Sequence, residues 1–332
     1  PFLNSLSELT DHLEGKISLL DQEISNHIEA IEEDQHLLGY SEELMASAAN
    51  FVKVYDDTHG PLWVQGSTLE SHFDRSLASN DIHWAVYWVM QYLIDYSYST
   101  DKLKDHAETL GPIVFGSSRD FPGHVDPSST PEATHSVNIN ASFLADEYGH
   151  LVYWWRENPA RKPTGTYLAP GTVATVTVPA AMVNKGYQIR VGAHSSDLSG
   201  QNRVLRLERS SIVYEITEKE TKVSNPLGGG IYIEVPYLAD AGVQSITIQN
   251  FVKMPFYSNN ETTGHITTLQ QWQNVERKSP APWADLQTEK YMLSVPTNWI
   301  NHFDDPVSLM EEWDKVVDVT NDLMGFPRKR GK

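Results

Sequence analysis

The chain has 332 residues, a formal net charge of −19, 40% hydrophobic residues and no cysteine. This length predicts two or three domains, and the apolar content is sufficient for packed cores. Disulfides, thiol catalysis and cysteine-ligated zinc are excluded, and nucleic acid is an improbable partner because its phosphates would be repelled. The chain begins at Pro1 without a signal peptide, which indicates a processed or trimmed protein.

Residues 1–110 read as an acidic helical domain, with 20 acidic and 5 basic side chains. An apolar stripe from Leu6 to Ile31 predicts one helix of about eight turns. Ser41 is placed to cap a second helix. The segment 81–98 is apolar on nearly every face but short and interrupted by polar residues, so it indicates a buried central helix and no membrane span. A last helix at 102–110 should end at the Gly111-Pro112 pair.

After residue 111 the composition and the predicted secondary structure change more than once along the chain. Residues 112–135 are rich in Gly, Pro, Ser and Asp and predict a linker. Short alternating segments in 136–274 predict an antiparallel β-sandwich. In the part 275–332, Asp305 and Pro306 should start an amphipathic helix that ends at Gly325. The predicted fold class is α+β, with domains at 1–111, 136–274 and 275–332.

Catalytic motifs are missing from the sequence. Zinc peptidases of the zincin type hold the metal with HExxH, and none of the 13 histidines lies in that pattern. No Gly-x-Ser-x-Gly occurs. Two weaker cation sites can be named, although turns are the favoured explanation for both. They are Asp120, His124 and Asp126, and a second group of Asp197, Gly200 and Asn202.

Glycines and tryptophans supply the remaining candidates. Gly228, Gly229 and Gly230 precede a strand, where a tight turn is the favoured interpretation and close approach to a ligand is the alternative. Exposed indole rings can bind sugars, because the flat ring matches the apolar face of a pyranose. For any single tryptophan, packing in a core is the commoner role. The tryptophans considered for sugar contact are Trp154, Trp155, Trp272, Trp283 and Trp299.

Several motifs carry a family resemblance. They are PTGTYLAPG at 163–171, VTVP at 176–179, RVGAH at 190–194, NPLGGGIYIEVP at 225–236 and the acidic helix EEWDKVVDVTNDLMG. In type, order and spacing they resemble the enhancin-like, mucin-directed zinc metallopeptidases, in particular the immunomodulating metalloprotease, or O-glycopeptidase, branch. In that family a zinc ion bound by HExxH and a downstream Glu activates water for cleavage beside an O-glycosylated Ser or Thr.

The resemblance implies that this chain is the non-catalytic N-terminal portion of a secreted peptidase, exported from a bacterium. Residues 275–332 would then be the start of its helical catalytic subdomain. No zinc is expected in the chain itself, while the intact parent would bind it. Expected partners are O-glycosylated proteins or glycopeptides and the remainder of the catalytic domain. Two alternatives stay open: an autonomous glycan-binding or adhesion module, and an interaction protein that docks through its acidic helices. The residues expected to line the substrate are Asn225, Gly228, Gly229, Gly230, Trp155 and Trp272.

Overall fold

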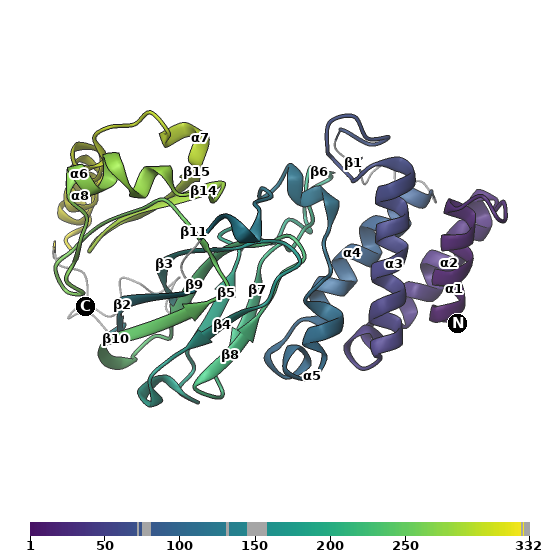
Figure 1. Cartoon of the computed structure of the whole chain (residues 1–332), viewed down its shortest axis with the longest axis horizontal. Helices are drawn as coiled ribbons and strands as arrows, with labels where there is room; N and C mark the ends of the chain where they lie inside the picture. Colours follow the sequence, from purple (N-terminus) through teal and green to yellow (C-terminus); the bar gives the residue numbers. More distant parts are fainter. Residues whose placement is uncertain (72, 75–80, 131–132, 145–157, 327, 329–332) are drawn as a thin grey trace.

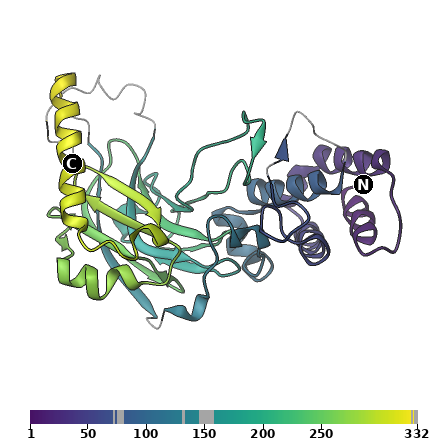
Figure 2. The same ribbon diagram turned by 90° about the horizontal axis from the view of Figure 1, so that it is seen from above.

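The computed structural model describes residues 1–71, 73–74, 81–130, 133–144, 158–326 and 328. Three parts follow one another along the long axis of the molecule (Figure 1). Helices lie at one end, two β-sheets in the middle, and a third part of mixed helix and strand at the other end. This order confirms the predicted α+β class. Figure 2 shows the last long helix at the end of the molecule opposite to the first helices.

The helical part packs around one central helix. Its elements are α1 (Phe2–Leu13), α2 (Asp21–Glu33), α3 (Glu42–His59), α4 (Ile82–Ser97) and α5 (Thr100–Leu110). Ser41 caps α3 as predicted, since its Oγ accepts the Leu44 N–H. The α4 helix is buried on nearly all sides, as its apolar sequence predicts. In the described part of the chain, no helix combines the length and the apolar content that crossing a bilayer requires.

The predicted eight-turn helix is two helices, and this prediction was wrong. The chain turns after α1, where Gly15 adopts a φ of 72°. His12 Nδ1 accepts the Leu19 N–H at 3.1 Å, and the Glu23 carboxylate accepts the Leu20 N–H at 2.8 Å, which starts α2. The apolar stripe still marks the buried face of both helices, because their buried apolar residues belong to the same core.

Two sheets form the middle part, as predicted. One sheet has the order β2-β10-β4-β8 and the other the order β11-β3-β9-β5-β7, and all pairings within them are antiparallel. The predicted strand at 151–155 lies outside the described residues. The strands are β2 (Thr134–Ser142), β3 (Ala160–Leu168), β4 (Ala174–Thr177), β5 (Gln188–Val191), β7 (Ile212–Glu215), β8 (Glu220–Val223), β9 (Gly229–Val235), β10 (Asp240–Gln249) and β11 (Val252–Lys253). A short pair, β1 (Phe73–Asp74) with β6 (Arg203–Val204), joins a helical-part loop to a sandwich loop.

The third part contains more strand than the sequence predicts. A sheet of order β13-β12-β14-β15 packs against three helices, and β12 runs parallel to β14. Its elements are β12 (Phe256–Asn260), β13 (His265–Ile266), α6 (Leu269–Asn274), β14 (Trp283–Thr288), β15 (Met292–Pro296), α7 (Thr297–Ile300) and α8 (Pro306–Met324). The α8 helix begins and ends as predicted, with Asp305 as its N-cap and Gly325 in the left-handed region. The structure groups α6 with this part, because Trp272 lies in its separate apolar core.

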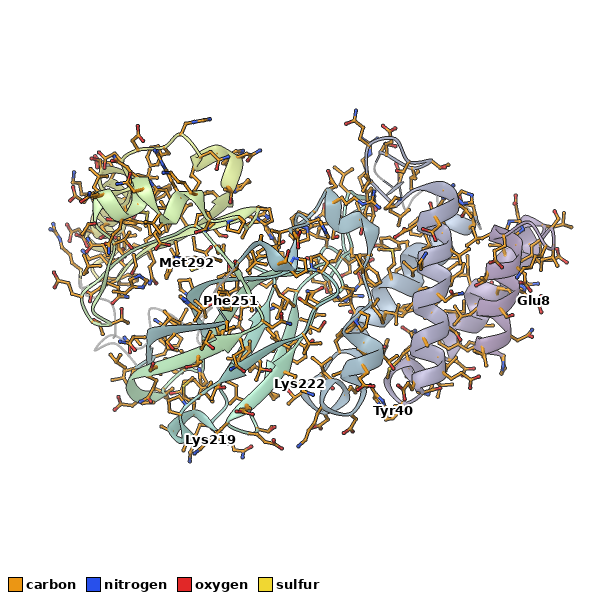
Figure 3. All side chains as sticks on the ribbon, in the orientation of Figure 1. Glu8, Tyr40, Lys219, Lys222, Phe251 and Met292 are labelled. Carbon is orange, nitrogen blue, oxygen red and sulfur yellow. The ribbon has the colours of Figure 1, made fainter. Side chains whose placement is uncertain are left out.

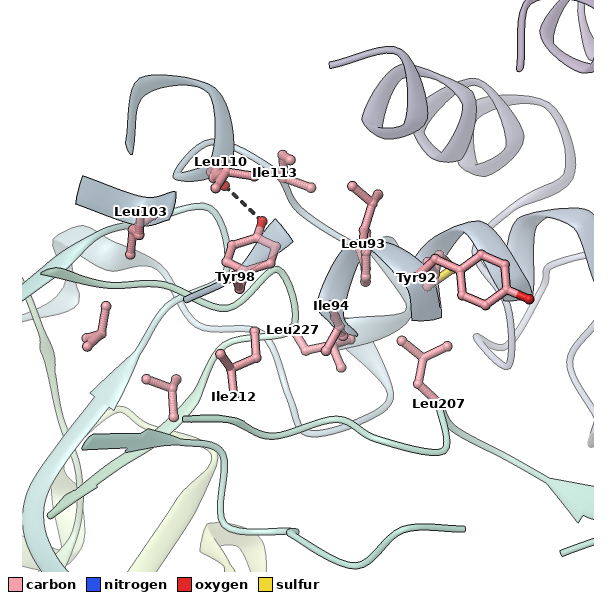
Figure 4. Packing of buried hydrophobic residues seen from close by; sticks show 14 of the residues in the cluster. Tyr92, Leu93, Ile94, Tyr98, Leu103, Leu110, Ile113, Leu207, Ile212 and Leu227 are labelled. Atoms are coloured by element: carbon pink, nitrogen blue, oxygen red, sulfur yellow. Dashed lines mark hydrogen bonds between the residues drawn. The ribbon is translucent and has the colours of Figure 1, made fainter. Parts of the chain in front are cut away.

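The segment expected to be a linker is packed. Phe115 is fully buried, and its N–H donates to Pro226 O at 2.9 Å. The next residue, Gly116, donates its N–H to Asp56 Oδ2 at 2.9 Å. One continuous apolar core therefore joins the helices to the sandwich. Figure 4 shows Leu93 and Ile94 of α4 close to Leu207 and Leu227 of the sandwich. Figure 3 shows side chains filling the space between the helical part and the sandwich.

Candidate functional site

The three glycines lie where β9 begins beside another backbone segment. Gly228 and Gly229 have φ values of 70° and 141°. A Cβ atom on Gly229 would come within 2.7 Å of the Gly192 Cα, so a side chain has no room there. Asn225 is also buried, and its amide donates to Val191 O at 3.2 Å and Ser210 O at 3.0 Å. The structure thus gives a packing reason for these residues, and their contact with substrate stays a prediction.

The same glycine turn borders a buried ion-pair network. Glu234 is only 2% exposed and accepts from the guanidinium of Arg190 through both carboxylate oxygens. Arg161 lies 3.4 Å from the same carboxylate and donates to Ala193 O at 2.6 Å and to Ser195 Oγ at 2.9 Å. Because these donors hold the backbone and side chains on both sides of His194, the network fixes the RVGAH segment in place.

His194 is the centre of what we call the junction cluster, formed by Phe121, His194, Arg206 and Trp283. The His194 ring centroid lies 4.7 Å from that of Phe121 and 4.6 Å from that of Trp283. The Arg206 guanidinium lies over the Phe121 ring at 4.7 Å. Burial, with further contributions from Arg206 and Arg161, lowers the pKa of His194 to about 4, so the imidazole is neutral near pH 7.

The junction cluster joins the segment that follows α5, the sandwich and the third part. Phe121 comes from the segment between α5 and β2, His194 and Arg206 from a sandwich loop, and Trp283 from the first position of β14. The Trp283 indole N–H donates to Pro122 O at 2.5 Å. All four side chains are partly exposed, so the cluster is accessible from solvent.

A cavity of about 370 Å³ opens on the other side of His194, between the sandwich and α4. Arg209 bridges the two walls, since its guanidinium lies 2.8 Å from the Asp95 carboxylate of α4 and 3.4 Å from Asp197. Gln91 of α4 reinforces the bridge by exchanging two hydrogen bonds with the Arg209 backbone, at 3.1 and 3.2 Å. The remaining lining is Ile94, Tyr98, Arg190, Ser195, Ser210, Ser211, Ile212 and Val213.

A buried carboxyl group lies where the sandwich meets the third part. Tyr232 of β9 donates its hydroxyl to Asp285 Oδ1 of β14 at 3.2 Å, and Arg161 lies over the Tyr232 ring at 5.6 Å. Burial raises the pKa of Asp285 to about 6. Guanidinium groups, ring faces and a neutral imidazole suit binding and positioning, so this region offers recognition chemistry.

The described residues do not form a recognisable zinc site. The sequence lacks HExxH, and in the described residues no three His, Asp or Glu side chains gather as a metal site would need. The two weaker cation candidates are turns. Asp126 accepts from the N–H and hydroxyl of Ser128, and Asp197 accepts from the Ser199 N–H at 2.8 Å and pairs with Arg209.

The structure places the tryptophan candidates in different environments. Trp272 is fully buried and donates its indole N–H to Phe303 O at 2.8 Å. Trp299 is 73% exposed on α7, and Trp283 joins the junction cluster. Trp154 and Trp155 lie outside the described residues. Sequence reasoning missed the site roles of Phe121, Arg161, Arg190 and Arg206. The RVGAH motif was an available signal, because it contains both Arg190 and His194.

Comparisons with known proteins match residues 129–332 to two domains of M60-type peptidases. The N-terminal domain of M60-like peptidases matches residues 129–249, and the domain described as peptidase M60, enhancin and enhancin-like matches residues 250–332. The TRPM8 channel-associated factor homolog of Xenopus laevis is 33% identical over 172 residues, which is 52% of this chain and 18% of that protein. Factor 3 of that name from Rattus norvegicus is 32% identical over 164 residues, covering 49% of this chain and 17% of that protein. The chain thus spans under a fifth of these relatives.

Solved structures that cover nearly the whole chain have low sequence identity to it. The IMPa structure from Pseudomonas aeruginosa, in complex with an O-glycopeptide, covers 96% of this chain and 32% of its own, at 8% identity and a TM-score of 0.47.

Proposed function

This chain belongs to the enhancin-like M60 peptidase family, and from that membership we propose that it is the non-catalytic N-terminal portion of a zinc metallopeptidase acting on O-glycosylated proteins. One observation carries the proposal. The two family domains occupy residues 129–332, yet these residues contain no HExxH. The zinc ligands of the active protein then lie outside this chain, and the chain contributes the structure around them. We propose in addition that the parent protein is secreted, as the family resemblance implies.

The contribution of the chain's own residues is to hold the start of the peptidase domain rigidly against the sandwich. Tyr232 of the sandwich links the two, since its hydroxyl donates to Asp285 of β14. Arg161, which pairs with Glu234, lies over the Tyr232 ring. Trp283 adds a second link through Pro122. A glycoprotein substrate would be oriented by the surface that these contacts keep in place. The O-glycopeptidase-like motifs support that substrate class.

An interaction module without peptidase activity is the second candidate. The curated relatives carry names that describe association with a channel, and they match this chain at 33% and 32% identity. The strongly acidic helical part would supply a docking surface for a basic partner.

Cleavage assays separate the two candidates. We expect the 332-residue chain to leave an O-glycosylated mucin-type protein intact, because its sequence lacks the HExxH motif that would hold the catalytic zinc. A longer version, with any residues that the gene encodes after Lys332, should cut that protein and lose activity with a chelator. The measurement is mass spectrometry of the products. Chelator-sensitive cleavage by the 332-residue chain alone would overturn its non-catalytic role, and an inactive longer version would favour the interaction module.

A further inference from the structure

The junction cluster lies in a region of positive charge within an acidic protein. The chain carries −19 overall, yet Arg161, Arg190 and Arg206 surround His194, and Arg161 and Arg190 share the single carboxylate of Glu234. Asp285 lies beyond the Tyr232 ring, fully buried. The field at His194 is therefore positive, consistent with the depressed pKa of this histidine. Such a field draws an anion to this part of the surface.

The three arginines differ in what remains available for a ligand. Arg190 donates to Glu234 and Ser211, and Arg161 donates to Ala193, Ser195 and Glu234. Arg206 is half-buried, and within the described part of the chain it has no carboxylate partner and makes no hydrogen bond. The central carbon of its guanidinium lies 4.7 Å from the centre of the Phe121 ring. A guanidinium presents N–H groups that bind a carboxylate through two parallel hydrogen bonds.

Aromatic rings lie next to Arg206 in the junction cluster. The rings of Phe121, His194 and Trp283 meet at angles of 70° to 81°, so they contact one another edge to face and are not stacked. The neutral imidazole of His194 adds a hydrogen-bonding group without a competing charge. A saccharide ring has both an apolar face for such rings and hydroxyl groups for the imidazole.

We propose that the junction cluster binds an acidic saccharide, with Arg206 holding its carboxylate and the aromatic rings of Phe121 and Trp283 contacting the sugar ring. The choice of a saccharide rests on the proposed function in O-glycoprotein recognition. The carboxylate and its contact with Arg206 rest on the geometry alone.

The test is an NMR titration of the 332-residue chain that follows the arginine Nε–H and tryptophan indole signals. N-acetylneuraminic acid is the probe, and its methyl ester is the matched ligand without the negative charge. We expect millimolar affinity for the acid, since few groups make contact, and at least tenfold weaker binding of the ester. Acetate and a glutamate-containing peptide report whether a carboxylate without a sugar ring is sufficient.

Two variants of the same loop provide the control. Arg206→Gln should weaken binding of the acid by about tenfold or more, because a charge-assisted hydrogen-bonded pair is lost. Arg203→Gln removes the same charge three residues away, where the side chain is 70% exposed, and should change affinity less than about twofold. Phe121→Leu should weaken the acid more than it weakens acetate. Circular dichroism confirms that each variant is folded.

The outcomes distinguish this inference from the proposed function. Equal effects of Arg206→Gln and Arg203→Gln, or equal affinity for acid and ester, would overturn the carboxylate site. Equal affinity for acetate and the acidic sugar would overturn the saccharide part. Because the titration needs no cleavage, a longer version that cuts glycoproteins without any acid-sugar binding here would contradict this inference alone. Binding with an inactive longer version would contradict only the peptidase role.

Discussion

At the scale of single residues, Asp285 carries a carboxyl group that the fold removes from water almost completely. The side chain is 1% exposed, its Oδ1 atom accepts from Tyr232, and its Oδ2 atom is also buried. Burial therefore dominates, and it raises the pKa to about 6 from an ordinary value of 3.8. The folded state holds the proton more tightly than the unfolded state between these two values. Ionisation of Asp285 thus lowers the free energy of unfolding as the pH rises from about 4 through 6.

Replacing Asp285 with Asn should remove this pH dependence. The amide keeps an acceptor for Tyr232 but has no charge to bury. The free energy of unfolding of the variant minus that of the wild type should rise by about 2 kcal/mol between pH 4.5 and 7.5. Chemical denaturation at several pH values measures this difference. Asp126→Asn is the control, because hydrogen bonds from Ser128 lower the pKa of that exposed carboxyl below 3.8, so its difference should stay nearly flat from pH 4.5 to 7.5. A difference that is flat with pH for Asp285→Asn would contradict the prediction.

At the scale of elements, local sequence signals predicted most helix ends correctly and one helix wrongly. The caps at Ser41 and Asp305 and the stop at Gly325 follow from side chains within a few residues. The stripe from Leu6 to Ile31 kept a helical spacing through a turn, so periodicity alone could not show that the chain reverses there. The signal was Gly15, whose positive φ starts the turn between α1 and α2.

Gly15→Ala tests whether this turn depends on glycine. The added methyl group would meet no atom within 4 Å, so any cost comes from the backbone conformation. A left-handed residue with a Cβ atom costs roughly 1 to 2 kcal/mol, and we expect a loss of stability of that size. Gly200→Ala provides a matched control, because it is equally open but lies outside the positive-φ region, and its effect should be close to zero. Thermal or urea unfolding gives both values, and equal effects would show that the turn tolerates a side chain.

At the scale of the whole molecule, composition predicted the order of the parts but not how they pack. The 112–131 segment has the residues of a linker, yet Phe115 and Ile113 are buried in the core shared by the helices and the sandwich. The junction cluster was also beyond prediction. Phe121, His194 and Trp283 are separated by more than 70 residues in sequence, and no local pattern indicates that long connections bring them together. The motifs did identify the family, because they lie in or next to the sandwich strands, which also hold His194 in place.

Limited proteolysis tests this packing directly. Since the backbone at Phe115 and Gly116 donates to Pro226 and Asp56, we expect proteases to leave the segment around Phe115 uncut in the native protein. Phe115→Ala empties a fully buried site and should cost about 3 to 5 kcal/mol, with new cleavage between the helices and the sandwich. The neighbouring Val114, 42% exposed, is the control, and Val114→Ala should cost less than about 1 kcal/mol and leave the cleavage pattern unchanged. Rapid cutting of the wild-type segment would instead show that the helical part is attached through a flexible linker and that the common core does not hold in solution.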